Sequence, residues 1–168
     1  MNIDVKKFRK ALAEYNPLKN SRVRKRASVL IPLLESEGEI FLMLTRRAIE
    51  MRSHPGQVSF PGGKQDKNDE GSMYTALRET YEEIGLSEDK IDVLGTLDQI
   101  LSLHYYLVTP YVGLIPSDFV PIPNTDEIES VFKVPLSFFM KSENHWSEEK
   151  EIFSFPVLVH HFEYQAYD

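Results

Sequence analysis

The sequence contains no cysteine and no long uninterrupted run of hydrophobic residues. Without cysteine there is no disulfide framework, no thiolate zinc site and no cysteine nucleophile, and this composition suits a reducing compartment. No apolar stretch approaches the roughly 20 residues that a membrane-spanning helix needs. The first ten residues lack the apolar core of a secretory signal, and the last three are not a peroxisomal address. We therefore predict a cytoplasmic protein with no membrane partner.

Positive charge is also scarce, because 19 Lys and Arg stand against 26 Asp and Glu, for a formal net charge of −7. Such a protein repels phosphate backbones, so we expect no nucleic-acid partner. An anionic small-molecule substrate would need a local basic pocket or a bound cation. The densest basic segment is 19–26. An exposed linker is its ordinary explanation, and a contact with a substrate phosphate requires the fold to bring it to a cleft.

The length of 168 residues, of which 42% are hydrophobic, predicts one domain with a sizeable core. Apolar residues at helical spacing predict helices from Asp4 to Asn16 and from just after Glu70 to about Glu83, the second ended by Gly85. A short helix is expected at 136–141. Apolar, β-rich segments predict strands at 29–34, 40–44, 57–60, 91–100, 105–115, 131–134 and 152–158, with a hairpin loop at 35–39. This pattern favours an α+β fold with helices on a central mixed sheet.

Three carboxylates share one face of the second predicted helix, since Glu82 and Glu83 follow Glu79 by three and four residues. They repel one another, and the nearby helix C-terminus also disfavours anions. A bound Mg²⁺ or Mn²⁺ would remove both penalties, whereas an exposed acidic face is the ordinary explanation of such clusters. Gly62 and Gly63 favour the metal site, because glycines let the backbone approach a ligand and the Gly62 carbonyl can add a ligand.

Arg78 lies directly beside these acids. It can pair with Asp69 or with Glu70 and so hold the preceding loop against the helix. A surface ion pair without further consequence is the alternative.

The segment from Gly63 to Leu86 resembles the Nudix box, G-x(5)-E-x(7)-R-E-U-x-E-E-x-G-U, whose bearers hydrolyse nucleoside diphosphates linked to another moiety. The match is strong from Arg78 onward, except that Thr80 replaces the usual bulky aliphatic residue. In the first half the early acidic position falls on Asp69, and one extra residue precedes Arg78.

Two upstream segments, 44–48 (LTRRA) and 54–63 (HPGQVSFPGG), are similar to the signature of the coenzyme A diphosphatase branch of that family. The resemblance implies a Nudix-type α/β/α sandwich with a central mixed β-sheet. It also implies a single domain over 1–168, in which 1–26 form an N-terminal helix and a basic segment. Members usually continue into a Trp-Gly turn and a last helix. Because the chain ends at Asp168, we expect that helix to be missing, in a short member or in a truncated chain.

The resemblance also implies the activity, namely divalent-metal-dependent hydrolysis of coenzyme A or its derivatives to 3′,5′-ADP and 4′-phosphopantetheine, with Mg²⁺ or Mn²⁺. It assigns Glu79 and Glu83 as metal ligands, Glu82 as a further ligand or as the base that activates water, and the Gly62 carbonyl as a backbone ligand. Arg78 belongs to the same catalytic group.

Further site residues are expected outside the box. In the late acidic group 126–129, Glu127 is the candidate base or extra ligand, with a solvated loop as the alternative. Arg46 and Arg47 point to opposite sides of a strand, so one of them can reach an anionic substrate, and the motif favours Arg47. Residues 104–106 could stack on an adenine or belong to the core. The predicted substrate-binding residues are Arg47, His54, Gln57 and Ser59.

Two other functions remain open. A Nudix hydrolase for ADP-ribose, NADH or another nucleoside diphosphate derivative would carry the same box. A non-catalytic nucleotide sensor would keep the fold, and loss of a box glutamate would favour it, but all three are present. The sequence leaves open whether free, acylated or oxidised coenzyme A is preferred, and whether the protein is a monomer or a homodimer.

Overall fold

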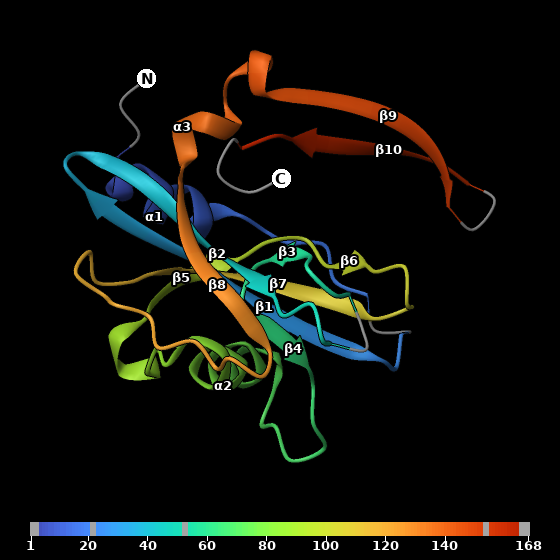
Figure 1. Ribbon diagram of the computed structural model, residues 1–168, viewed down its shortest axis with the longest axis horizontal. Helices are drawn as coiled ribbons and strands as arrows, with labels where there is room; N and C mark the ends of the chain where they lie inside the picture. Colours follow the sequence, from blue (N-terminus) through green and yellow to red (C-terminus); the bar gives the residue numbers. More distant parts are fainter. Residues whose placement is uncertain (1–3, 21–22, 52–53, 153–154, 165–168) are drawn as a thin grey trace. The chain divides into compact units, whose positions relative to one another are not determined.

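The computed structural model describes residues 4–20, 23–51, 54–152 and 155–164 (Figure 1). The chain divides into two compact units, Met1–Val134 and Pro135–Asp168, and the expected single domain stays a prediction. Its elements, with η for 3-10 helices, are α1 (Val5–Glu14), β1 (Arg26–Ser36), β2 (Glu39–Arg47), β3 (Val58–Ser59), β4 (Gly62–Lys64), α2 (Ser72–Ile84), η1 (Glu88–Lys90), β5 (Asp92–Thr96), β6 (Ile100–Leu101), β7 (Leu107–Leu114), β8 (Ile128–Pro135), α3 (Leu136–Phe139), η2 (Ser142–Asn144), β9 (His145–Ile152) and β10 (Phe155–Phe162).

The sheet of the first unit is built around β1. One edge of β1 pairs in parallel with β7, from Arg26↔Leu107 to Leu33↔Leu114. Its other edge is split, because β4 pairs with residues 27–29 and β2 with residues 33–36, both antiparallel. Strands β3 and β8 pair with β2, and β5 and β6 pair with β7. Parallel and antiparallel pairings coexist, so the predicted mixed sheet is confirmed.

The β1–β2 hairpin closes with only two residues, Glu37 and Gly38, both at positive φ. This is the conformation of a type I′ turn, whose twist matches that of the flanking strands. The predicted loop at 35–39 was therefore too long. Glycine at the second position makes the turn favourable, and the register that follows buries Leu33 opposite Leu42.

Helix α2 covers the side of the sheet on which the main hydrophobic cluster lies. That cluster consists of Leu30, Leu34, Met43, Ile84, Leu86 and Ile115. Thr80, which the box usually fills with an aliphatic residue, is fully buried, and its hydroxyl donates to the Ala76 carbonyl at 2.7 Å. The helix ends as predicted at Gly85, which adopts φ 73° and donates its N–H to Tyr81.

Helix α1 packs on the opposite face. A Cβ added at Gly95 in β5 would lie 3.1 Å from the Cβ of Leu12, so the helix sits directly over this strand. Gly95 pairs with Val112, whereas the neighbouring Tyr111 makes a 2.7 Å hydroxyl contact with Ser72 of α2. Successive strand residues point to opposite faces, so α1 and α2 lie on opposite sides of the sheet, as Figure 1 shows. The predicted α/β/α sandwich is confirmed.

The second unit contains α3, η2 and an antiparallel β9–β10 hairpin, with Phe162 opposite His145. The rings of Trp146 and His161 are stacked on one face of this hairpin, with their centroids 3.8 Å apart. Strand β9 was not predicted, because its centre is a run of charged residues that resembles a loop. The predicted strand at 152–158 is found as β10 from Phe155 onward, and residues 153–154 lie outside the described part.

Two further expectations about strands were wrong or incomplete. The segment 91–100 is not one strand but β5 followed, after a break, by β6. The segment Gly62–Lys64, for which no strand was predicted, forms β4. Within the described residues, no helix has the length and apolar character needed to cross a membrane.

Asp69 fastens the loop before α2 to the helix. Its carboxylate accepts two hydrogen bonds from Arg78, both at 3.0 Å, one from the Thr75 hydroxyl at 2.8 Å and one from the Asp66 N–H at 2.9 Å. The side chain is only 3% exposed. The bonds with Arg78 are the main reason that the pKa of Asp69 falls from 3.8 to about 2. Of the two acids that could pair with Arg78, the structure selects Asp69.

We expect Asp69→Asn to lower the free energy of unfolding by about 1–2 kcal/mol at pH 7. A depressed carboxyl pKa stabilises the fold above the unfolded value of 3.8 and ceases to do so as the pH falls toward 2. The deficit of the variant should therefore shrink to roughly half near pH 3.

Urea denaturation at pH 7, 4 and 3 measures this, with the exposed Glu70→Gln as the control. A deficit as large at pH 3 as at pH 7 would show that the ionised carboxylate is not what stabilises the loop.

Candidate functional site

A pocket of about 560 Å³ opens where β4, α2 and the ends of β2 and β3 meet. Its lining combines the predicted residues Arg47, His54, Gln57, Ser59, Gly62, Glu79, Glu83 and Glu127. Arg78 and Glu82, the remaining two, do not line it. The split edge of β1 explains its position, because the gap between β4 and β2 leaves room for side chains of α2.

Two glycines bring the backbone of β4 against the carboxylates of α2. A Cβ added at Gly63 would overlap with the carboxylate of Glu79, and one at Gly62 would overlap with the Ser28 carbonyl of β1. Gly62 also adopts φ 151°, which side-chain-bearing residues rarely adopt. Gly62 therefore requires glycine, because a Cβ would meet backbone atoms of β1, whereas a Cβ at Gly63 would displace the carboxylate of Glu79.

Glu83 is the most deeply buried acid of the site, with 3% of its surface exposed. Its carboxylate accepts a hydrogen bond from the Gly62 N–H at 3.0 Å and lies 3.6 Å from Nη1 of Arg47. Burial raises its pKa to about 7, although Gly62 and Arg47 act in the opposite direction. The charges of Glu79 and Glu127 raise it further. At neutral pH this group is poised between its two protonation states.

Glu79 and Glu82 are held by one cation. Arg78 makes ion pairs of 3.0 Å with Glu79 and 2.9 Å with Glu82, in addition to its bonds with Asp69. Burial raises the pKa of Glu79, an effect that Arg78 opposes. The guanidinium thus orients two acids and ties both to the loop before the helix.

Arg46 and Arg47 diverge as expected from strand alternation. Arg46 pairs with Glu129 at 3.4 Å, whereas Arg47 lines the pocket. The Nε–H of Arg47 is buried and has no hydrogen-bond partner in the described part of the chain. Because this atom is buried, the rest of the Arg47 side chain lines the pocket.

Strand alternation over the predicted strand 57–60 would place Gln57 and Ser59 on one side and Phe60 on the other. Gln57 and Ser59 line the pocket as expected, but Phe60 lines it as well. The reason is that β3 consists only of Val58–Ser59, so the strand period ends before Phe60. The Ser59 hydroxyl lies 3.2 Å from that of Thr45.

Backbone hydrogen bonds carry Glu127 into the pocket. The Asn124 N–H donates to the Glu83 carbonyl at 2.9 Å, and the Ala48 N–H donates to the Glu127 carbonyl at 2.8 Å. These bonds tie the 122–128 segment to the end of α2 and to the end of β2. Its neighbour Asp126 is exposed, so only one member of this late acidic group lines the pocket.

The pocket contains carboxylate donors suited to a hard divalent cation. Glu79, Glu83 and Glu127 all line it, and oxygen ligands are what Mg²⁺ and Mn²⁺ prefer. In the described ranges, however, no three His, Asp or Glu side chains converge into a group that could already hold a metal. Arg47 and Arg78 contact these acids instead. The donor chemistry fits a metal, while the assignment of individual ligands stays a prediction.

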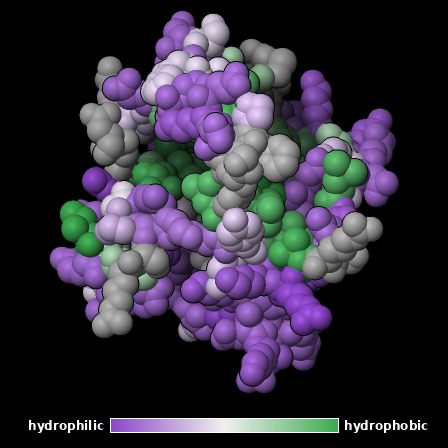
Figure 2. Space-filling model, turned by 90° about the vertical axis from the view of Figure 1, so that its right-hand side faces the viewer, coloured by the Kyte–Doolittle hydropathy of each residue, from purple (hydrophilic) through white to green (hydrophobic). Residues whose placement is uncertain are grey.

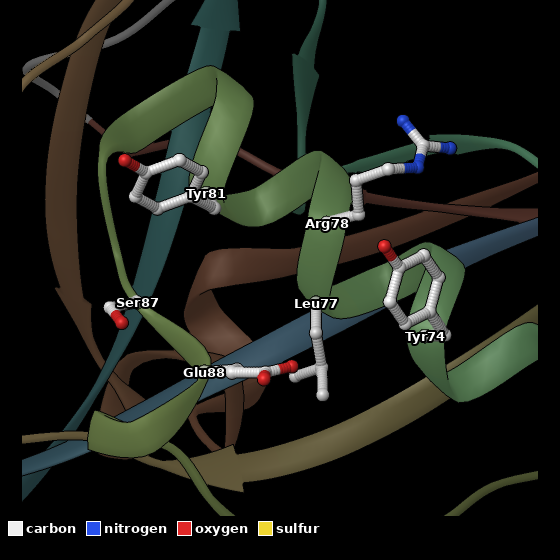
Figure 3. A pocket seen from close by; sticks show the side chains of 6 residues that line it. All are labelled: Tyr74, Leu77, Arg78, Tyr81, Ser87 and Glu88. Atoms are coloured by element: carbon white, nitrogen blue, oxygen red, sulfur yellow. The ribbon is translucent and has the colours of Figure 1, made fainter. Parts of the chain in front are cut away.

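A smaller hollow, of about 280 Å³, lies on the outer side of α2 (Figure 3). Its lining comprises Tyr74, Leu77, Arg78, Tyr81, Ser87 and Glu88. None of the three box glutamates lines it, and the guanidinium of Arg78 extends away from Tyr81 and Ser87 in this view. Glu79 and Glu83 line the larger pocket, so we place the site there.

Sequence reasoning missed the pocket residues Met51, Lys64 and Asp66. Lys64 belongs to β4, whose pairing with β1 depends on contacts between residues far apart in the chain. No local signal identified them. The run of polar residues between Gly63 and Asp69 was the only hint that this loop borders a site.

Comparison with known proteins places these features in a family. The model of the NUDIX domain matches residues 24–154. Nudix hydrolase 15, mitochondrial, of Arabidopsis thaliana is 43% identical over 147 residues, covering 86% of this chain and 52% of that protein. Peroxisomal coenzyme A diphosphatase NUDT7 of Mus musculus is 38% identical over 138 residues, covering 82% and 58% respectively. The chain thus spans little more than half the length of these relatives.

Solved structures agree on the fold. A C. elegans Ap4A hydrolase binary complex superposes with a TM-score of 0.56 at 17% identity, covering 67% of this chain and 81% of that one. The NUDIX domain of Shewanella oneidensis NrtR complexed with ADP ribose gives 0.55 at 20% identity, covering 78% and 84%. These likenesses show the fold alone. Together with the domain match over residues 24–154, they lead to one conclusion: the chain belongs to the NUDIX domain family.

Proposed function

We propose that this chain is a divalent-metal-dependent hydrolase that splits the diphosphate bond of coenzyme A or a derivative into 3′,5′-ADP and 4′-phosphopantetheine. One observation carries the proposal: a single pocket contains Glu79, Glu83 and Glu127 together with Arg47. The similarity to a coenzyme A diphosphatase supports the choice of substrate. The upstream residues that resemble this branch, among them His54 and Gln57, line the same pocket.

The chemistry requires charge neutralisation, because diphosphate oxygens repel an incoming nucleophile. Glu79 and Glu83, with Glu82 or the Gly62 carbonyl, are the proposed ligands of Mg²⁺ or Mn²⁺. A bound ion of this kind supplies positive charge at the diphosphate and acidifies the attacking water.

The remaining steps fall to side chains of the chain itself. Arg47, which lines the pocket and pairs with Glu83, is the proposed contact for a phosphate oxygen. Glu127 or Glu82 accepts the proton of the attacking water. Arg78 acts as a positioning residue, since it orients Glu79 and Glu82. His54, Gln57 and Ser59 are the proposed substrate contacts.

The cytoplasmic location predicted from the sequence stays a prediction, since the relatives include proteins named for mitochondria and peroxisomes. The location does not affect the assignment of the pocket.

We expect Glu83→Gln to reduce turnover by more than about a hundredfold, because the amide removes a charged ligand from a site that depends on several kcal/mol of charge stabilisation. Glu82→Gln should also abolish turnover. Mass spectrometry of the products, after incubation with coenzyme A, ADP-ribose and NADH in parallel, measures the effect.

The exposed Glu88→Gln serves as the matched control, and circular dichroism checks that all variants fold. Release of 4′-phosphopantetheine by the wild type supports the proposal. If only ADP-ribose or NADH is cleaved, that compound replaces coenzyme A as the proposed substrate. If none of the three compounds is cleaved, a nucleotide sensor is favoured. Unchanged turnover in both Glu82→Gln and Glu83→Gln would show that these two acids have no part in the mechanism.

We further expect turnover to be lost in excess EDTA and restored by Mg²⁺ or Mn²⁺, since the buried acids need a counter-cation at the diphosphate. The measurement is the rate of product release against the concentration of free metal. Full activity in excess chelator would contradict the metal requirement.

A further inference from the structure

A second pocket borders the proposed active site. It has a volume of about 500 Å³ and shares Val29, His54, Gly62, Gly63 and Lys64 with the first. Its remaining lining comes from β1, from β7 and from the turn before β7, where the ring of His104 meets that of His54 at 4.7 Å. The two pockets are therefore adjoining compartments, and the side chain of His54 belongs to the boundary of both.

The floor of the second pocket is one face of the sheet. Ala27 of β1 pairs with Lys64 of β4 on one side and with Val108 of β7 on the other, so these three lie in one row. Lys25 and Tyr106 lie two residues before Ala27 and Val108, just ahead of β1 and β7. The hydrogen bond from the Leu107 N–H to the Lys25 carbonyl extends the pairing, so the period of two places both on the same face. Leu30, which packs against α2, belongs to the opposite face. The floor thus faces away from the helix that carries the acids.

Two ammonium groups stand over this floor. The Nζ atoms of Lys25 and Lys64 each lie 5.5 Å from the centroid of the Tyr106 ring. Both side chains are exposed, and across the described residues neither makes an ion pair with a carboxylate. In a chain with a net charge of −7, two uncompensated cations on one ring form a local anion-attracting site.

Apolar surface accompanies these charges. Ala27, Val29 and Val108 form the apolar part of the floor, and Leu103 on the rim is 60% exposed. Figure 2 looks from the right-hand side of Figure 1, the side on which β6 is drawn, and shows hydrophobic side chains at the surface between hydrophilic ones. A pocket of this size with an apolar floor and a few polar groups is typical of a small-molecule site.

We propose that the second pocket receives the nucleoside of the substrate and that Lys25 and Lys64 bind a phosphomonoester on it. The proposal rests on the function proposed above and names the residues that give it a preference among substrates. In coenzyme A, the group is the 3′-phosphate of the adenosine half, which leaves as part of 3′,5′-ADP. The diphosphate lies in the first pocket, and the linked nucleoside extends past His54 onto the floor beside Tyr106.

This arrangement also gives a role to part of the basic segment 19–26, of which residues 21–22 lie outside the described part. The Lys25 carbonyl accepts a hydrogen bond from the Leu107 N–H at 2.9 Å, which extends the pairing of β1 with β7. Its ammonium group thereby lies over Tyr106, which lines the pocket. A substrate with no phosphomonoester, such as ADP-ribose or NADH, would leave both lysines without an anionic partner. The pair therefore selects among diphosphates that the acidic box alone treats alike.

The test compares kcat/KM for coenzyme A and for 3′-dephospho-coenzyme A in the wild type, Lys25→Gln and Lys64→Gln. Each exposed lysine should contribute about tenfold, which corresponds to about 1.4 kcal/mol, so each substitution should lower the ratio of the two values by on the order of tenfold. Lys90→Gln, an exposed lysine of η1 outside both pockets, is the matched control and should keep the wild-type ratio. Cleavage of both substrates with an unchanged ratio in both lysine variants would overturn the proposal.

A binding experiment separates this proposal from the proposed function. Calorimetry with 3′,5′-ADP and with 5′-AMP reports the preference for the 3′-phosphate without any turnover. If the wild type cleaves neither coenzyme, the proposed hydrolysis fails. A wild-type preference for 3′,5′-ADP that falls about tenfold in the lysine variants supports the subsite, and equal affinities of the wild type for both nucleotides overturn it.

Discussion

The close contact between the backbone of β4 and the acids of α2 is the constraint on which the rest of the site depends. At Gly62 the backbone N–H donates to Glu83, and at Gly63 there is no room for a side chain beside Glu79. The contact is possible because one edge of β1 is divided between β4 and β2, which leaves a gap in the sheet. A Cβ at Gly62 would clash with the backbone of β1, and one at Gly63 would displace the carboxylate of Glu79. The two glycines therefore let β4 lie close to β1 and to the acids of α2.

This contact has an electrostatic cost that the protein offsets only in part. Burial raises the pKa of both Glu79 and Glu83, and the charges of their neighbours raise it further. Arg47 and Arg78 compensate from two sides, each paired with one of these acids. A network that served stability alone would gain from apolar residues in these positions. Its persistence in a pocket is what one expects where stability is given up for the binding of a cation and an anionic substrate.

How far the sequence predicted this arrangement depends on the range of the interactions. Helix α2 and its end at Gly85 were predicted correctly, because helical periodicity and a glycine cap are local signals. Strand alternation, also a local signal, predicted that Arg46 and Arg47 diverge. The motif favoured Arg47, which lines the pocket, and its contact with the substrate stays a prediction. The extent of β3 was not predicted correctly, because the distinction between Phe60 and its neighbours depends on where pairing with β2 ends.

Long-range pairing explains the larger omissions. Strand β4 has only three residues, two of them glycine, and nothing in its own sequence favours a strand. It exists because β1 offers it an edge. The selection of Asp69 over Glu70 as the partner of Arg78 likewise depends on the fold of the loop, in which Thr75 and Asp66 supply further donors to the same carboxylate. The assignment of metal ligands within the acidic face stays a prediction.

Strand β4 also joins chemistry to selectivity. Its three residues contact three different parts of the site: Gly62 bonds Glu83, Gly63 lies against Glu79, and the Lys64 carbonyl accepts a hydrogen bond from Arg78 at 3.3 Å. The side chain of Lys64 meanwhile stands over Tyr106 in the second pocket. A shift of this strand would therefore move the acids and the proposed phosphomonoester site together. Because the backbone of β4 serves the first pocket and the side chain of Lys64 serves the second, the identity of that side chain can change substrate preference while the glycines keep the acids in place.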